Sequence, residues 1–232
     1  MFFPFGDDHI KGKYKPVFTY LLIIINCYIF WREIQLTEEE ISNLFFNYGA
    51  VPREIMQGNR LFTLVTSTFL HGGWSHLIGN MMFLWIFADN IEITIGNFRF
   101  AIFYLLGGIF GAAVHCYLFA GSQVPCIGAS GAISACLGAY LVLYPTSRIK
   151  VFFFFFIFRV SAFFFLGLWI LQQVLNGWAS IGPGTTDTAG VGYWAHIGGF
   201  AYGFVYGFAV RIKRGRRKVN RLDVFGDRDS YY

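Results

Sequence analysis

Serine, histidine and asparagine side chains occur inside apolar segments of this sequence, where polar groups are costly and are therefore candidates for function. Three stretches stand out, at residues 71–80, 128–131 and 195–199. A serine hydroxyl becomes a good nucleophile when a neighbouring base accepts its proton, and histidine is the usual base. Ser130 and His196 are therefore a candidate nucleophile and base, provided that the fold brings them together.

The composition is that of a membrane protein. Of the 232 residues, 56% are hydrophobic and only 13% are charged, and the mean hydropathy is +0.52. A soluble domain solvates its surface with about a quarter charged residues. We therefore predict an all-α membrane protein with a single membrane domain. The four cysteines make no CxxC or metal-ligand spacing, and we interpret them as small apolar residues.

Six apolar segments are candidates for membrane-spanning helices, each of which needs about 20 mostly apolar residues. They cover residues 17–31, 74–88, 100–120, 124–145, 160–177 and 191–210. We start the fifth helix near Arg159, because an earlier start would place this charge near the middle of the bilayer. The phenylalanine-rich run at residues 152–158 is then expected to lie along the membrane interface.

Basic residues gather before the first predicted helix and after the last one. By the positive-inside rule both ends are cytoplasmic. We therefore divide the chain into a cytoplasmic N-terminal segment (1–16), a six-helix membrane domain (17–210) and a basic cytoplasmic tail (211–232). The tail also fits binding to anionic lipid or nucleic acid, but a topology anchor is the simpler explanation and no nucleic-acid partner is expected. Residues 32–70 are expected to form a compact outer loop, and residues 121–123 and 182–184 short ones.

The predicted topology places the three polar groups at one depth. The second, fourth and sixth helices all begin at the outer face. His76 lies about two residues into its helix, Ser130 about six and His196 about five, so at about 1.5 Å rise per residue their depths agree within roughly 10 Å. Taken singly, each residue is better explained as a helix cap or an interhelical contact. Their common depth favours a single site.

The chemistry of these groups is that of a Ser–His dyad. His76 and Asn80 are four residues apart, share one helix face and can donate together to a tetrahedral oxyanion. The backbone N–H of Ser130, near a helix N-terminus, is a third donor. No acidic residue lies near this depth in the fourth or sixth helix. No metal or other cofactor is expected, because His71 and His76 lack the i, i+4 spacing of a helical zinc pair.

Small residues on two helices predict a close contact between them. Gly199, Gly203 and Gly207 recur at every fourth residue of the sixth helix. Gly131 and Gly138, with Ala135 between them, give the fourth helix a comparable face. This pattern permits close approach of helix backbones, which a hydrogen bond between Ser130 and His196 needs.

Together these stretches resemble the rhomboid family of intramembrane serine proteases. The matching residues are His71 with His76-Leu-Ile-Gly-Asn80, Gly128-Ala-Ser130-Gly131, and Ala195-His196-Ile-Gly-Gly199 followed by Gly203. They occur in the family's order, and the six-helix core and long first outer loop match as well. The resemblance implies a six-transmembrane-helix rhomboid-like bundle.

The resemblance also implies roles for the site residues. Ser130 is the expected nucleophile, His196 the general base, and His76 and Asn80 the oxyanion donors. The matching His71, Gly128, Gly131 and Gly199 are expected to support them, His71 by hydrogen bonding. Some members carry a tyrosine that packs under the histidine, where this chain has Ser134, and another aromatic residue is expected to replace it.

Similar proteins cleave single-span membrane proteins near the outer end of the substrate helix, so the expected partners are transmembrane-helix substrates and the lipid bilayer. A bacterial cytoplasmic membrane is the expected location, and the oligomeric state is left open. The alternative is a catalytically weak rhomboid-like protein that binds membrane clients. A transporter or channel predicts polar residues spread through the membrane depth, whereas here they cluster at one level.

Overall fold

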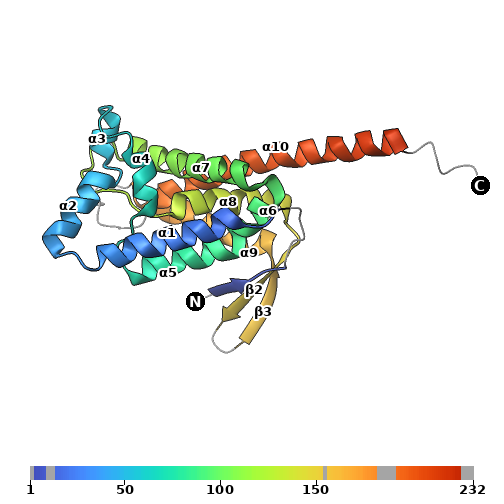
Figure 1. The fold of residues 1–232 in the computed structure, drawn as a ribbon, viewed down its shortest axis with the longest axis horizontal. Helices are drawn as coiled ribbons and strands as arrows, with labels where there is room; N and C mark the ends of the chain where they lie inside the picture. Colours follow the sequence, from blue (N-terminus) through green and yellow to red (C-terminus); the bar gives the residue numbers. More distant parts are fainter. Residues whose placement is uncertain (1–2, 9–13, 154–155, 182–191, 226–232) are drawn as a thin grey trace, which may run out of the picture.

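The computed structural model describes residues 3–8, 14–153, 156–181 and 192–225, and shows a bundle of helices with a small sheet at its side (Figure 1). The main helices of the bundle are α1 (Val17–Glu33), α5 (Trp74–Phe83), α7 (Asn97–Leu118), α8 (Ser130–Leu143), α9 (Ala162–Ala179) and α10 (Tyr193–Phe225). The remaining elements are β1 (Phe3–Gly6), α2 (Glu38–Tyr48), α3 (Pro52–Met56), α4 (Thr63–Thr66), η1 (Ser67–Phe69), η2 (Leu84–Ala88), α6 (Asp89–Ile95), β2 (Arg148–Phe153) and β3 (Phe156–Ser161).

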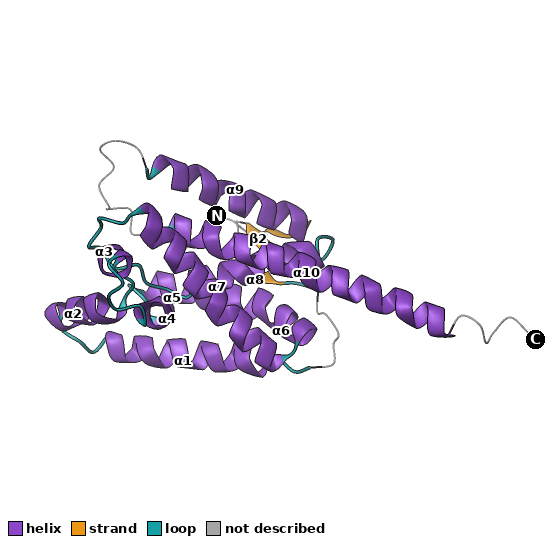
Figure 2. Cartoon of the chain, turned by 90° about the horizontal axis from the view of Figure 1, so that it is seen from above, coloured by secondary structure: helices purple, strands orange, loops and turns teal. Residues whose placement is uncertain are grey.

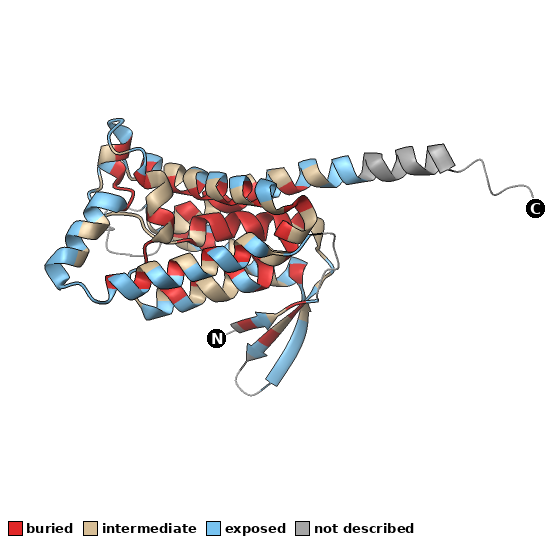
Figure 3. Ribbon diagram, viewed as in Figure 1, coloured by how far each residue is buried: buried red, intermediate tan, exposed pale blue. Residues whose placement is uncertain are grey.

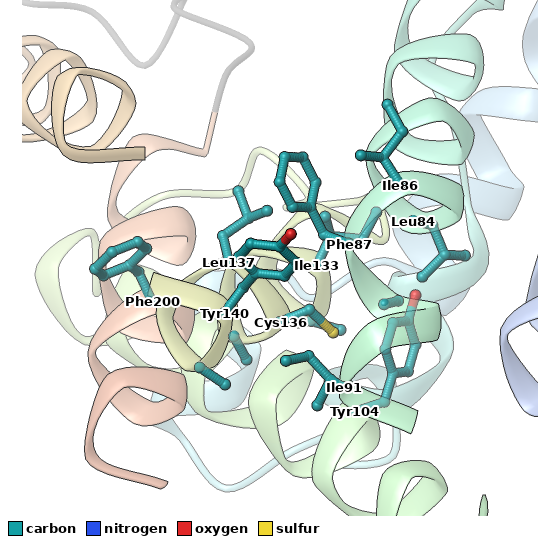
Figure 4. Packing of buried hydrophobic residues seen from close by; sticks show 14 of the residues in the cluster. Leu84, Ile86, Phe87, Ile91, Tyr104, Ile133, Cys136, Leu137, Tyr140 and Phe200 are labelled. Atoms are coloured by element: carbon teal, nitrogen blue, oxygen red, sulfur yellow. The ribbon is translucent and has the colours of Figure 1, made fainter. Parts of the chain in front are cut away.

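Helix α8 lies at the centre of the bundle. Every residue from Gly131 to Tyr140 is buried, as Figure 3 shows. A helix that is apolar on all sides must be surrounded by other elements, and α8 packs against α7 and α10. Larger side chains complete this core, with Tyr140 set edge-on against Phe87 at 5.1 Å between ring centroids (Figure 4). The central helix is thereby held rigidly by its neighbours.

The segment that the sequence predicts as a compact outer loop, residues 32–70, contains α2, α3, α4 and η1 at one end of the bundle (Figure 1). Helix α2 begins with a capping box, in which Thr37 accepts from the backbone N–H of Glu40 and the Glu40 carboxylate accepts from Thr37. These hydrogen bonds stabilise the charged carboxylate and lower the pKa of Glu40. Helix α10 projects from the opposite end of the bundle.

The predicted helix boundaries hold well for α1 and α7 but were wrong for the second and fourth segments. The second continues through a π-helical turn, η2, and α6 as far as Ile95, where Gly96 ends it with a φ of +92°. The fourth begins six residues later than predicted, at Ser130. Pro125 and Gly128, whose φ is +119°, keep residues 124–129 non-helical. Ser130 is therefore the first residue of its helix.

The all-α prediction was wrong, because the chain also forms a three-stranded antiparallel sheet in the order β1-β2-β3. The phenylalanine-rich run forms a hairpin in which Val151 pairs with Phe158 and Lys150 with Arg159. Hydropathy alone does not separate a buried strand from a helix, and aromatic and β-branched residues favour strands. Helix α9 then begins at Ala162, after the Ser161 cap. The location of the hairpin at a membrane interface stays a prediction.

Two of the helices are candidates for membrane spans. Among the described residues, α7 and α9 are long and apolar enough to cross a membrane on length and composition, and α8 is apolar but shorter. Figure 2 shows α9 at the edge of the bundle, whereas α8 lies inside it. The predicted loop at residues 182–184 lies outside the described residues. The structure is therefore mostly helical, and six spans remain a proposal.

A buried carboxylate fixes the start of α1. Pro16 precedes this helix and gives no side-chain cap. Instead Glu92, fully buried, accepts hydrogen bonds from the backbone N–H groups of Phe18 and Thr19, each at 2.8 Å, and from Asn97 at 2.8 Å. These bonds satisfy the free N–H groups of the helix start.

We expect the Glu92→Ala substitution to lower the free energy of unfolding by about 3 kcal/mol, since each buried donor left without a partner costs about 1–3 kcal/mol. Unfolding in detergent micelles measures the loss. Glu39→Ala, at an exposed position of α2, is the control and changes stability by a few tenths of a kcal/mol, roughly. Equal stability of the two variants would contradict this role of Glu92.

Candidate active site

The structure joins Ser130 and His196 by a hydrogen bond. The distance from Ser130 Oγ to His196 Nε2 is 2.8 Å, although the two residues are 66 positions apart. Ser130 is the first residue of α8 and His196 the fourth residue of α10. A hydroxyl and an imidazole at this distance have the geometry of an activated nucleophile.

The predicted close contact between α8 and α10 is confirmed, and glycines make it possible. A Cβ atom at Gly199 would lie 2.0 Å from the carbonyl oxygen of Gly131, and one at Gly203 would lie 1.8 Å from that of Ala135. A Cβ at Gly138 would lie 2.2 Å from the carbonyl of Phe200. Because side chains larger than hydrogen do not fit, these glycines set the separation of the helices that carry the dyad.

The N-terminus of α8 presents backbone donors next to the serine. Its N-cap residue is Ala129, which makes no side-chain cap hydrogen bond. The preceding residue, Gly128, is anchored by a 2.9 Å hydrogen bond from its N–H to the carbonyl of Ser67. The first N–H groups of a helix have no partner within the helix, and the helix dipole adds positive potential there. This end of α8 is suited to bind a developing oxyanion.

His76 and Asn80 of α5 lie beside this helix start. A Cβ atom at Gly128 would lie 2.6 Å from His76 Nε2 and 3.6 Å from Asn80 Nδ2. The amide Nδ2 of Asn80 is buried and has no hydrogen-bond partner among the described residues. An unpaired buried donor is costly unless a ligand uses it. The two side chains therefore lie beside Gly128 and line the same cavity as Ser130.

His71 contacts His76 rather than the dyad. The two rings lie edge to face with centroids 5.1 Å apart, and the backbone N–H of His71 donates to the Glu33 carboxylate at 3.3 Å. Neither ring nitrogen of His71 has a partner within the described part of the chain. The packing against His76 is consistent with a supporting position, whereas its hydrogen-bonding role stays a prediction.

Two residues of α9 complete the surroundings of His196, and the sequence interpretation missed them. Gln173 Oε1 lies 2.8 Å from His196 Nδ1, and the Trp169 ring lies 5.9 Å from the imidazole, centroid to centroid. Trp169 is thus an aromatic neighbour, whereas Ser134 donates to the Ser130 carbonyl at 2.6 Å. The polar pair Gln172 and Gln173 inside an apolar segment was the signal that could have found Gln173.

A cavity of about 500 Å³ contains the dyad. Its walls come from α5, α8, α9 and α10 together with the segments that precede α5, α8 and α10, and its polar lining includes Ser130, His196, His76 and Asn80. Apolar side chains form much of the rest: Phe83, Ile127, Ile133, Leu137 and Trp169. A mostly apolar pocket with a few convergent polar groups is the usual form of an active site.

We expect Gly128→Ala to lower kcat for peptide-bond cleavage by about 100-fold, as loss of an oxyanion donor does. The new methyl group meets the ring of His76, and a φ of +119° is unfavourable for any residue with a Cβ. Gly121→Ala is the matched control, because no atom lies within 4 Å of its Cβ position. Kinetics on a peptide or protein substrate compare the two, and equal kcat values would contradict the placement of His76.

The structure thus shows a serine and a histidine in hydrogen-bond contact, lining a cavity in a bundle of apolar helices. The family model of the Rhomboid domain matches residues 58–213. The chain therefore belongs to the rhomboid family of integral membrane proteins, whose members are typically serine proteases.

Relatives in bacteria, plants and fungi agree with this assignment. The chain is 35% identical over 135 residues to Rhomboid protease GluP of Bacillus subtilis (strain 168), covering 58% of this chain and 26% of that protein. It is 32% identical over 165 residues to RHOMBOID-like protein 4 of Arabidopsis thaliana, covering 71% of this chain and 38% of that protein. It is 27% identical over 172 residues to Rhomboid protein 1, mitochondrial, of Saccharomyces cerevisiae (strain ATCC 204508 / S288c), covering 71% of this chain and 46% of that protein. The matches span about a quarter to a half of each relative's length.

Proposed function

We propose that this protein is an intramembrane serine endopeptidase that acts through the Ser130–His196 dyad. The observation that carries the proposal is the 2.8 Å contact between Ser130 Oγ and His196 Nε2 in a cavity inside the bundle. Membership of the rhomboid family supports it, as does the name of the Bacillus subtilis relative, a rhomboid protease.

The dyad can carry out both halves of acyl transfer. Ser130 Oγ attacks the substrate carbonyl carbon while His196 Nε2 takes the hydroxyl proton. The carbonyl oxygen becomes an oxyanion, which the Ser130 backbone N–H, Asn80 Nδ2 and His76 Nε2 stabilise as donors. His196 then gives its proton to the leaving amine, which leaves an acyl group on Ser130. Water attacks the ester with His196 as base, which releases the carboxyl product and restores the serine.

The proposed substrates are single-span membrane proteins, cut near the outer end of their transmembrane helix. We place six spans across the membrane with both termini in the cytoplasm, so that the dyad lies near the outer face, at the end of the bundle where Gly128 contacts η1. A substrate helix is about 10–12 Å wide with its carbonyls hydrogen-bonded internally. A cavity of about 500 Å³ instead suits a short unwound segment. The resemblance to rhomboid proteases likewise implies helix-destabilising residues beyond the cleavage point.

Cleavage in liposomes tests this function. The purified protein is reconstituted with a tagged single-span substrate, beside Ser130→Ala and His196→Ala variants. We expect the unmodified protein to release a shortened product and both variants to be inactive. Binding of intact substrates without cleavage by the unmodified protein would support the alternative, a client-binding protein. Cleavage by Ser130→Ala would assign the reaction to another nucleophile.

A further inference from the structure

The side chain of Gln173 contacts the dyad but has no role in the reaction steps described above. Its side chain is 6% exposed and comes from α9, whereas the two dyad residues come from α8 and α10. Its Oε1 lies 2.8 Å from His196 Nδ1, and the opposite ring nitrogen lies 2.8 Å from Ser130 Oγ. Serine, histidine and glutamine therefore form a continuous hydrogen-bonded chain.

A neutral imidazole carries one proton, and its position decides whether the dyad can react. Nε2 accepts the serine proton only when it is unprotonated, and the ring proton then resides on Nδ1. An acceptor opposite Nδ1 stabilises this tautomer, as the aspartate of a Ser-His-Asp triad does. A carboxamide oxygen is an acceptor too, and within 2.8 Å of Nδ1 it serves the same purpose without a charge.

We propose that Gln173 is the positioning residue of the dyad, and that its Oε1 accepts a hydrogen bond from His196 Nδ1–H and holds the reactive tautomer. The inference rests on the proposed serine-protease function. Trp169, one turn earlier on α9, packs against the same ring and limits its rotation. Together the two side chains fix the direction in which Nε2 points.

The neighbouring Gln172 is a control that distinguishes a positioning role of Gln173 from simple helix packing. Gln172 is exposed, whereas Gln173 is buried against His196, although both lie on α9 and have the same side chain. A glutamine that serves only as interhelical contact supports stability but has no reason to bond the base of a catalytic pair. Substitution of Gln172 therefore reports on the general effect of losing a glutamine from this helix.

The test compares Gln173→Met, Gln173→Glu and the control Gln172→Met in liposomes with a single-span substrate. We expect Gln173→Met to lower kcat by about 100-fold, the lower range for loss of effective general-base catalysis, with KM unchanged because substrate binding is kept. Gln173→Glu retains an acceptor and restores most of kcat. Its carboxylate stabilises the protonated imidazole, so the acid limb of kcat/KM moves to higher pH. Gln172→Met behaves as the unmodified protein.

Labelling of Ser130 by a fluorophosphonate gives a second readout that does not depend on substrate entry. We expect the labelling rate to fall in Gln173→Met, to recover in Gln173→Glu and to be unaffected in Gln172→Met. Thermal unfolding identifies a variant that fails to fold. If Gln173→Met fails to fold, the pH profile of kcat/KM in Gln173→Glu tests the positioning role of Gln173.

Two results would overturn the assignment of Gln173 while leaving the proposed protease intact. One is an unmodified protein that cleaves and a Gln173→Met variant with the same kcat and labelling rate. The other is a Gln173→Glu variant that neither restores activity nor moves the acid limb. If the unmodified protein neither cleaves the substrate nor reacts with the fluorophosphonate, the result would instead contradict both the proposed protease function and this inference.

Discussion

Substitution of Ser130 by alanine is expected to lower kcat for cleavage of a single-span substrate by about 10⁴-fold or more. The reason is chemical, because the methyl group offers no lone pair to attack the carbonyl carbon and no proton for His196 to accept. The remaining pocket still binds substrate, so KM stays close to that of the unmodified protein. Steady-state kinetics in liposomes measure both constants.

The dyad also predicts how two substitutions combine. Because Ser130 and His196 act as one unit across a 2.8 Å hydrogen bond, the double variant is expected to be no slower than Ser130→Ala alone. If the two residues contributed independently, the fold loss of kcat in the double variant would instead be the product of the two single losses. Multiplied losses would mean that His196 acts on the reaction without Ser130, contrary to the proposed mechanism.

Substitution of Gly203 by alanine is expected to lower the free energy of unfolding by about 3 kcal/mol. The added Cβ would lie 1.8 Å from the carbonyl oxygen of Ala135, so α8 and α10 must separate. Separation loosens the packing around the central helix and lengthens the contact between Ser130 and His196. Cleavage activity therefore falls together with stability.

Gly167 is the matched control for this substitution, because it also lies within a helix but has no atom within 4 Å of its Cβ position. Alanine is preferred over glycine in a helix by about 1 kcal/mol, so Gly167→Ala is neutral or stabilising. Thermal and denaturant unfolding in micelles compare the variants. A Gly203→Ala protein as stable as Gly167→Ala would contradict the close packing of α8 and α10.

The sequence allowed the main part of the site to be predicted. Ser130 and His196 were paired from their common depth and their chemistry, and the structure places them in hydrogen-bond contact. His76 and Asn80 were placed on one face of a helix, and both line the same cavity. The proximity of these residues could be anticipated because helix geometry restricts where polar groups inside apolar segments meet, whereas their roles stay predictions.

Features that depend on tertiary contacts could not be predicted from the sequence. The sheet could not be predicted because hydropathy marks residues 152–158 only as an apolar segment, and its pairing with the distant strand β1 is a tertiary contact. The start of α8 was placed too early because residues 124–129 are apolar, although Pro125 and Gly128 break the helix. Gln173 was overlooked because only the packing of α9 against α10 shows which of two adjacent glutamines faces His196.

Covalent trapping of the nucleophile tests the central claim most directly. The purified protein in liposomes is treated with a fluorophosphonate, digested, and analysed by peptide mass spectrometry. We expect a single phosphonylated residue, Ser130, with a labelling rate that falls sharply in His196→Ala because the base no longer takes the hydroxyl proton. Modification of another residue, or of Ser130 at the same rate in His196→Ala, would contradict a Ser130–His196 dyad.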